Sequence, residues 1–352
     1  MSGMRWDHLR LSASGSEATP TLFGDGGGVD GQAGVVVRTF DTPGFRGVTC
    51  YEIRARSVIN RVPAASRMPF RWTINPYRGC THACRYCFAR KTHTYLDFDA
   101  GRDFDTQIVV KVNTPELVRR ELSVPSWRGE HVAMGTNVDC YQRAEGRYRL
   151  MPGVLAALRD AANPFSILTK GSLILRDLPL LTQAAQVTDV STAVSVGFTD
   201  QELWRAVEPG TPNPDRRLDV VRALSSAGVR CGVLMAPILP FLADSPDQLD
   251  QTVRAIAQAG AASVTPIVLH LRPGAREWYL GWLESFRPDL LAGYRRLYRA
   301  GAYADRDYQH AITDQVRALA ERYGIGPTGE GEHRITQPPA TVRPTPDQLT
   351  LL

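Results

Sequence analysis

The chain has 352 residues, a mass of 38.8 kDa and a formal net charge of +5 from 41 basic and 36 acidic residues. Hydrophobic residues make up 43% and charged residues 22%, which excludes a mainly disordered, collagenous or coiled-coil chain. The longest apolar run, residues 231–243, is only 13 residues long and contains two prolines, so we expect no membrane span. The first residues lack the apolar core of a secretory signal, and we therefore expect a cytoplasmic protein.

Five segments follow one another along the chain. Residues 1–45 open with a Gly/Ser-rich stretch and predict a flexible leader, and residues 46–70 predict a basic N-terminal arm. Residues 71–275 alternate short apolar runs with amphipathic stretches and predict the main domain. Residues 276–326 predict a C-terminal helical extension, and residues 327–352 a Pro-rich tail.

The alternation in the main domain and the extension predicts individual elements. Strands are predicted at residues 71–75, 107–112, 131–135, 165–169, 192–197, 230–236 and 263–269, and helices at 115–122, 152–162, 200–207, 214–227, 245–259, 275–286 and 307–323. Asp200 and Ser245 stand where helix N-caps are expected, and Gly228 and Gly260 where helices should end. The repeated strand–helix order predicts an α/β fold, either a partial (β/α)6 barrel of TIM type or a doubly wound sheet. In both architectures, functional residues gather at the carboxyl ends of the strands.

A tight group of cysteines follows the first of these strands. Half of the six cysteines fall within eight residues, namely Cys80, Cys84 and Cys87. A chain of this length with six cysteines is not a disulfide scaffold, and a triplet in a reducing compartment indicates a metal ion or cluster. Three thiolates can bind three irons of a [4Fe–4S] cluster and leave the fourth iron open, as a catalytic site requires. The alternative is a non-catalytic zinc or iron–sulfur module, in which His82 or His93 would complete a zinc site.

The Cys-x-x-x-Cys-x-x-Cys spacing, with an aromatic residue before the last cysteine and a strand before the loop, resembles the radical SAM superfamily. In that family the open iron binds the amino and carboxylate groups of S-adenosylmethionine, and the 5′-deoxyadenosyl radical formed from it abstracts a hydrogen atom from the substrate. The resemblance implies that Cys80, Cys84 and Cys87 bind the cluster and that Tyr86 lies beside the adenine.

Further segments are similar to the spore photoproduct lyase-like branch of this superfamily, and most closely to its uncharacterised bacterial relatives. These segments are NPYRGCTHACRYCFAR, GTNVDCYQRAEGRYRL, LTKG, VEPGTPNPDRRL and APILP, and the likeness covers residues 55–275. It implies that Lys170 and Ser195 hold the methionyl carboxylate, and a lysine forms a charge-assisted bond there. The alternatives are a solvated lysine at a strand end and a small core serine.

The contact to the methionyl amine departs from the family pattern. Gly135, Thr136 and Asn137 occupy the place of the Gly-Gly-Glu motif that binds this amine in the superfamily, and the glutamate is missing. The resemblance therefore implies that Asn137, Asp139 or the backbone makes the contact.

No cysteine of this chain aligns with the cysteine that donates a hydrogen atom in the lyase. The lyase uses a thiol near the end of the second barrel strand, and the alignment places that thiol at Gly135, five residues before Cys140. Cys140 is a candidate donor from the same barrel mouth, and the alternative is a small buried hydrophobic residue. Further candidates to line the site are Arg90, His93, Tyr141, Gln142 and Arg143.

The basic excess is concentrated around the cysteines. Residues 52–91 contain nine basic residues against Glu52 alone, a stretch that suits an anionic cluster, a phosphate-bearing substrate or nucleic acid, or simply solvated arginines. We expect a radical SAM enzyme with a [4Fe–4S] cluster and S-adenosylmethionine, an unknown substrate, and an electron donor such as a flavodoxin or ferredoxin. Lyase-like repair of a nucleic-acid lesion and the non-catalytic metal module are the alternatives.

Overall fold

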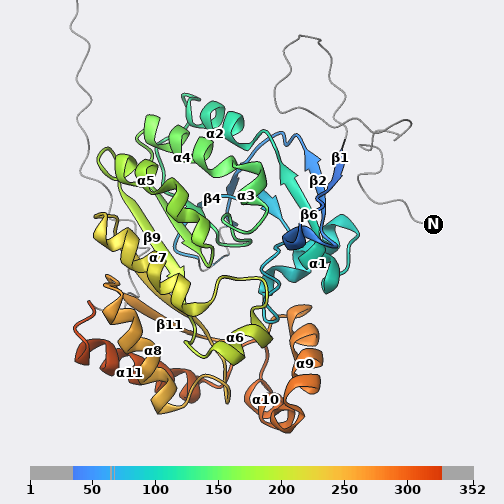
Figure 1. The fold of residues 1–352 in the computed structure, drawn as a ribbon, viewed down its shortest axis with the longest axis vertical. Coiled ribbons are helices and arrows are strands. Elements are labelled where there is room, and N and C mark those ends of the chain that lie inside the picture. Colours follow the sequence, from blue (N-terminus) through green and yellow to red (C-terminus); the bar gives the residue numbers. More distant parts are fainter. Residues whose placement is uncertain (1–34, 64–65, 67, 327–352) are drawn as a thin grey trace, which may run out of the picture.

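Within the part of the chain that the structure describes, six parallel strands form the centre of the molecule (Figure 1). The structure is a computed structural model and describes residues 35–63, 66 and 68–326. The strands lie side by side in the order β4 (Trp72–Ile74), β7 (Val132–Met134), β8 (Phe165–Thr169), β9 (Val190–Ser195), β10 (Cys231–Ile238) and β11 (Val264–Val268). At the free edge, β3 (Ile59–Arg61) pairs antiparallel with β4. Each of these six strands pairs with the one that precedes it in this order, so the spatial order follows the sequence order. This confirms the partial (β/α)6 barrel, because the strand order of a doubly wound sheet reverses at a switch point.

Helices connect these strands and cover the outer face of the sheet. They are α2 (Thr114–Leu122), α4 (Leu150–Asp160), α5 (Leu178–Ala185), α6 (Gln201–Val207), α7 (Pro214–Ser226) and α8 (Pro246–Gln258). The predicted caps are confirmed: the Asp200 carboxylate accepts the N–H groups of Glu202 and Leu203, and Ser245 forms a capping box with Gln248.

A second, four-stranded sheet lies beside the barrel. Its order is β1 (Val36–Thr39), β2 (Thr49–Ile53), β6 (Gln107–Lys111) and β5 (Tyr77–Arg78). The predicted strand at 107–112 is therefore real but lies outside the barrel, because its apolar face packs with Cys50 and Tyr77 in a separate core. The expected flexible leader ends too late, since β1 and the 3-10 turn η2 (Pro43–Phe45) fall within residues 1–45. Residues 1–34 of the leader and the expected tail lie outside the described residues.

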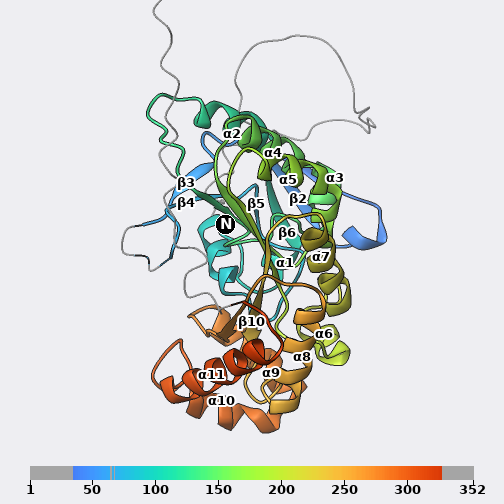
Figure 2. The ribbon, with the colours of Figure 1, turned by 90° about the vertical axis from the view of Figure 1, so that its left-hand side faces the viewer.

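Short elements around the cysteines and the C-terminal helices complete the molecule. They are the 3-10 segments η3 (Phe88–Leu96), η4 (Ser172–Asp177) and η5 (Pro288–Leu290), and the helices α1 (Arg102–Thr106), α3 (Glu145–Tyr148), α9 (Ala275–Phe286), α10 (Leu291–Leu297) and α11 (Arg306–Arg322). Figure 2 shows α9, α10 and α11 at one end of the molecule and α2 at the other. Among the described residues, no helix has the length and apolarity that crossing a bilayer requires.

Candidate functional site

The cysteine loop connects β5 to η3 and is held from two sides. The Gln142 side chain accepts the N–H of Thr81 at 2.9 Å and donates to the carbonyl of Gly79 at 2.9 Å. On the other side, the N–H of Arg85 donates to the carbonyl of Val207. Gln142, a candidate to line the site, is therefore a buried residue that positions the loop.

Two other candidates are also internal. Arg90 is completely buried; it donates to the Cys84 carbonyl at 2.9 Å and forms an ion pair with Asp105 at 2.8 Å. His93 lies 2.8 Å from the carbonyl of Gln107 through Nε2. These contacts hold the cysteine loop against η3, α1 and β6. Neither Arg90 nor His93 is therefore a solvent-facing loop residue.

The thiols lie close together in a buried environment. Cys80 and Cys84 are buried, and Cys87 is partly exposed. The pKa of Cys80 is raised, mainly because the thiol is buried. The nearby Asp139 carboxylate and the other two thiols raise this pKa further. Burial also raises the pKa of Cys84, while the nearby Lys170 ammonium lowers it. Thiols with raised pKa values keep their protons until a metal replaces them.

The donor set suits a cluster. Among the described residues, no three Cys, His, Asp or Glu side chains are arranged as a site for a metal ion. A [4Fe–4S] cluster binds its thiolates on separate irons, so its ligands need not meet at one point. His82, proposed as a zinc ligand, has its Nδ1 3.4 Å from Asp139.

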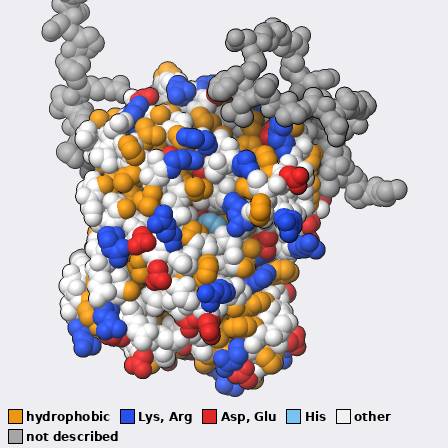
Figure 3. Space-filling view, in the orientation of Figure 1, with side chains coloured by type: hydrophobic (Ala, Val, Ile, Leu, Met, Phe, Trp, Pro, Cys, Tyr) orange, Lys and Arg blue, Asp and Glu red, His pale blue; other side chains and the backbone are white. Residues whose placement is uncertain are grey.

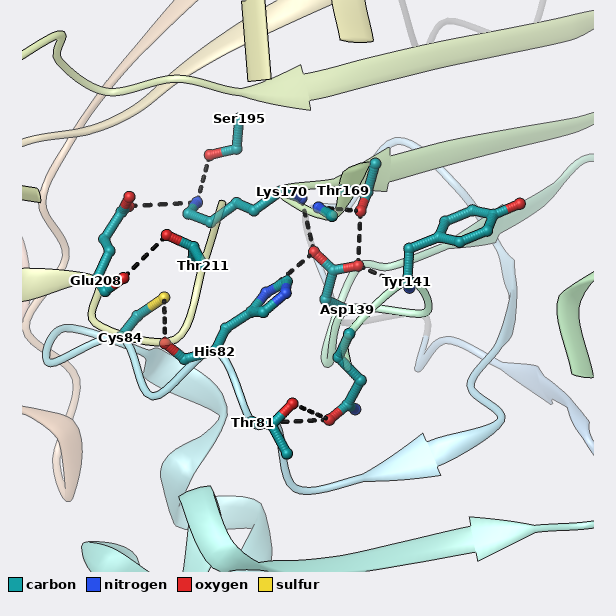
Figure 4. A network of polar contacts seen from close by, with 12 residues as sticks. Thr81, His82, Cys84, Asp139, Tyr141, Thr169, Lys170, Ser195, Glu208 and Thr211 are labelled. Carbon is teal, nitrogen blue, oxygen red and sulfur yellow. Dashed lines mark hydrogen bonds and ion pairs between the residues drawn. The ribbon is translucent and has the colours of Figure 1, made fainter. Parts of the chain in front are cut away.

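Asp139 joins the loop after β7 to the end of β8 (Figure 4). Its carboxylate accepts Thr169 Oγ1 at 2.7 Å, the N–H of Lys170 at 2.6 Å and the N–H of Tyr141 at 2.8 Å. These bonds occupy most of the acceptor capacity of the carboxylate. Within the described residues, the partly exposed side chain of Asn137 makes no hydrogen bond. Asn137, rather than Asp139, keeps free capacity for a ligand.

Lys170 and Ser195 meet at the carboxyl ends of β8 and β9. Lys170 Nζ donates to Ser195 Oγ and lies 3.9 Å from Glu208 Oε1, with its side chain 15% exposed (Figure 4). Ser195 Oγ donates in turn to the carbonyl of Ala236 at 2.7 Å. Lys170 is therefore not a fully solvated lysine at a strand end, because its side chain is mostly buried. Ser195 is not simply a small core residue, because its hydroxyl forms hydrogen bonds with Lys170 and Ala236.

Glu208 is a site residue that sequence reasoning missed. It lies in the connection between α6 and α7, is completely buried, and accepts hydrogen bonds from the Tyr86 hydroxyl and from Arg217 Nη2, the latter at 2.5 Å. Burial raises its pKa, but Arg217, Lys170 and Tyr86 outweigh that effect and hold the pKa below its usual value. The segment VEPGTPNPDRRL contained both Glu208 and Arg217, and was the one signal available.

A cavity of about 550 Å³ opens next to this network. Tyr141 and Thr211 line it, together with Arg143 and Arg147. Figure 3 shows a histidine side chain near the middle of this face, with Lys and Arg side chains on either side. Among the described residues neither Arg143 nor Arg147 has an acidic partner; Arg143 donates to the carbonyl of Gly44, and Arg147 donates to Thr42 Oγ1 at 3.1 Å. Tyr141 and Arg143 are thus at the cavity, as the sequence suggested.

The surroundings of Cys140 and Gly135 show whether a hydrogen-atom-donating thiol fits at either position. Cys140 is completely buried and is not among the residues that line the cavity. Gly135 has φ +76°, and a Cβ atom there would lie 1.8 Å from the carbonyl oxygen of Leu168. No side chain, and therefore no thiol, fits at Gly135 without a backbone shift.

Comparisons with known proteins agree with this architecture. An uncharacterised protein of Mycobacterium tuberculosis is 47% identical over 349 residues, covering 99% of this chain and 100% of the relative. An uncharacterised protein of Methanocaldococcus jannaschii is 28% identical over 195 residues, covering 55% of this chain and 69% of that protein. Spore photoproduct lyase complexed with dinucleoside spore photoproduct has a TM-score of 0.59 at 15% identity, covering 78% of this chain and 79% of the lyase chain.

A variant of that lyase with bound AdoMet and dinucleoside spore photoproduct gives a TM-score of 0.58 at 17% identity, covering 77% and 78% of the two chains. At such identities the similarity shows a shared fold. The family itself is shown by a sequence model described as the Radical SAM superfamily, which matches residues 74–260. This match includes the cysteine loop, Lys170, Ser195 and Glu208, and the chain therefore belongs to the radical SAM superfamily.

Proposed function

We propose that this protein binds a [4Fe–4S] cluster through Cys80, Cys84 and Cys87 and uses S-adenosylmethionine to abstract hydrogen from a substrate in the 550 Å³ cavity. The observation that carries the proposal is the meeting of the thiol loop with the Lys170–Ser195 pair at the mouth of the barrel. When bound, cluster and cofactor together supply a reductive cleavage that yields a carbon radical. We also propose a cytoplasmic location, where thiols such as these six free cysteines stay reduced.

The chain's own residues would orient the cofactor. Lys170 and Ser195 offer a cation and a hydroxyl for the methionyl carboxylate. Asn137 offers an amide oxygen to the methionyl amine in place of the missing glutamate. Tyr86 would lie beside the adenine, with its hydroxyl tied to Glu208. Arg217 holds the pKa of Glu208 below its usual value, and the Glu208 carboxylate lies 3.9 Å from Lys170 Nζ.

A phosphate-bearing substrate, such as a nucleic-acid lesion, is the substrate we favour. Arg143 and Arg147 line the cavity without an acidic partner in the described part of the chain, and arginine suits phosphate oxygens. The structural likeness to spore photoproduct lyase complexed with dinucleoside spore photoproduct supports a substrate derived from nucleic acid. The absence of space for a thiol at Gly135 argues for a different hydrogen donor from that of the lyase.

An external reductant would reach the cluster from the side of Cys87. Of the three thiols, Cys87 is the one that is partly exposed. A one-electron carrier such as a flavodoxin or ferredoxin is therefore expected to approach the protein there.

The test uses anaerobically purified protein. Iron and sulfide content are measured first, followed by electron paramagnetic resonance of the dithionite-reduced sample with and without S-adenosylmethionine, and an assay for 5′-deoxyadenosine. A cluster signal that changes with S-adenosylmethionine, together with 5′-deoxyadenosine, supports the proposal. Bound zinc and no response to S-adenosylmethionine would overturn it in favour of the non-catalytic module.

A further inference from the structure

The reaction site accounts for only part of the basic segment at residues 52–91. Arg90 is internal, whereas Arg56, Arg61 and Arg71 are exposed around β3 and the start of β4. Arg61 and Arg71 lie at the amino end of β4, opposite the mouth that holds the cysteine loop, because Arg61 pairs with Trp72, the first residue of that strand.

Two tryptophans form a groove in this region. Trp72 begins β4 and Trp127 precedes β7, and their rings meet edge to face with centroids 5.2 Å apart. With Arg56 and Arg120 they line a second cavity of about 280 Å³. Trp127 Nε1 donates to Asn163 at 2.7 Å, whereas Trp72 Nε1 is buried without a hydrogen-bond partner among the described residues.

Arginines surround the groove with little opposing charge. Arg61 stands directly opposite Trp72 in the β3–β4 pair, so the two side chains share a face of the sheet. In the described part of the chain, none of the following exposed arginines forms an ion pair: Arg56, Arg61, Arg71, Arg119, Arg120 and Arg128.

The acidic residues nearby are largely occupied. The Glu121 carboxylate lines the groove and accepts the N–H groups of Val58 and Ile59, each at 2.9 Å. Glu116 pairs with Arg54 at 2.9 Å. Glu130 is exposed nearby in sequence. The face therefore keeps a clear positive excess.

We propose that this groove, formed by Trp72, Trp127, Arg56 and Arg120, binds single-stranded nucleic acid outside the reaction cavity. Indole rings provide stacking surfaces for bases, and arginines neutralise the phosphates between them. The groove is concave and its tryptophans are half-buried, which suits an inserted base better than a lipid surface, where aromatic side chains project outward. The proposal does not depend on the radical chemistry, because it requires neither cluster nor cofactor.

The test measures binding of a fluorescein-labelled 15-nucleotide oligo-dT to the full chain by anisotropy over a range of salt concentrations. We expect binding that weakens with salt. The Arg56→Glu/Arg120→Glu variant should bind at least tenfold more weakly and lower the slope of log K against log salt by about 1.4, since each neutralised phosphate contributes about 0.7. The matched control is Arg295→Glu/Arg296→Glu on α10, two exposed arginines at the opposite end of the molecule (Figures 1 and 2).

Stacking is tested separately with Trp72→Phe/Trp127→Phe, which keeps two aromatic rings. Oligo-dT should quench the tryptophan fluorescence of the unmodified protein, and this variant should bind with similar affinity while losing most of the quenching. Equal weakening by both arginine pairs would overturn the proposed site. Absence of oligo-dT binding would also overturn it, including the case in which the protein binds vesicles containing phosphatidylserine instead. Neither result would affect the test for S-adenosylmethionine cleavage.

Discussion

Arg217 donates to Glu208 across 2.5 Å in an environment where both side chains are almost completely buried. Arg217 also donates to the carbonyl of Ser195 at 2.8 Å, so one guanidinium connects α7, the loop carrying Glu208 and the end of β9. Glu208 in turn binds the Tyr86 hydroxyl, next to the last cysteine of the triplet. This ion pair couples the cysteine loop to the barrel.

Arg217→Met should therefore destabilise the protein strongly. Removing Arg217 leaves the buried Glu208 carboxylate without its direct ion pair and with only Lys170, 3.9 Å away, as a nearby cation; losing the partner of a buried ion pair costs about 3–5 kcal/mol of the free energy of unfolding. Urea denaturation measures this loss. Adding Glu208→Gln to the same chain should recover a large part of it, because the stranded charge is removed. A single variant as stable as the unmodified protein would contradict the assigned pair.

Replacing any one of Cys80, Cys84 or Cys87 by Ala should abolish S-adenosylmethionine cleavage and reduce the bound iron. The barrel should remain folded, as far-ultraviolet circular dichroism would show. Cys50→Ala is the matched control, because Cys50 is a buried thiol in the core of the second sheet. A triplet variant with full cleavage would remove that cysteine from the ligand set.

Lys170→Met should weaken S-adenosylmethionine binding while the absorbance of the cluster stays unchanged. Loss of one hydrogen bond to a charged group costs about 1.5–3 kcal/mol, which corresponds to roughly a 10- to 150-fold rise in Kd. Equilibrium dialysis with labelled S-adenosylmethionine measures the change. Arg205→Met, an exposed position on α6, serves as the control. Unchanged affinity would show that Lys170 does not hold the carboxylate.

Cys140→Ala distinguishes a core thiol from a hydrogen donor. Complete burial leads us to expect a stability loss of about 1 kcal/mol and an unchanged rate of 5′-deoxyadenosine formation. Denaturation and a chromatographic assay measure the two quantities. If the variant forms 5′-deoxyadenosine normally but no longer completes turnover of substrate, Cys140 is the donor that the sequence suggested.

Lys111 should make the stability depend on pH in the alkaline range. Burial, with Arg78 nearby, lowers the pKa of Lys111 from 10.5 to about 8. Between these values the unfolded chain binds the proton more strongly, so the contribution of Lys111 to stability rises with pH. The buried ammonium costs on the order of 3 kcal/mol near neutrality.

Lys111→Met should accordingly raise the free energy of unfolding at pH 7, and the gain over the unmodified protein should shrink towards pH 10.5. Comparing the two proteins at each pH cancels the titration of the tyrosines and cysteines. A gain that does not change with pH would mean that Lys111 titrates normally.

Local patterns in the sequence sufficed to predict the elements of the barrel, and they carry the prediction of the cluster ligands. The Asp200 and Ser245 caps act on N–H groups two or three residues away, so their neighbours alone specify them. The spacing of the cysteine triplet is likewise contained in eight residues. Short apolar runs predict the strands at these positions, because a strand that is buried on both faces of the sheet needs apolar side chains on both faces.

Contacts between distant segments were decided only by the tertiary structure. Lys170 and Glu208 are brought together by adjacent strands and loops, and no local pattern in either segment marks the other. The sequence pattern of the strand Gln107–Lys111 is that of a barrel strand. The strand nevertheless pairs with β2, because its apolar side chains pack in the core of the second sheet. Only glycine fits at position 135 because the carbonyl of Leu168, from the neighbouring strand, occupies the space of a side chain. Periodicity specifies which face of an element is buried, whereas the packed fold determines which element it is buried against.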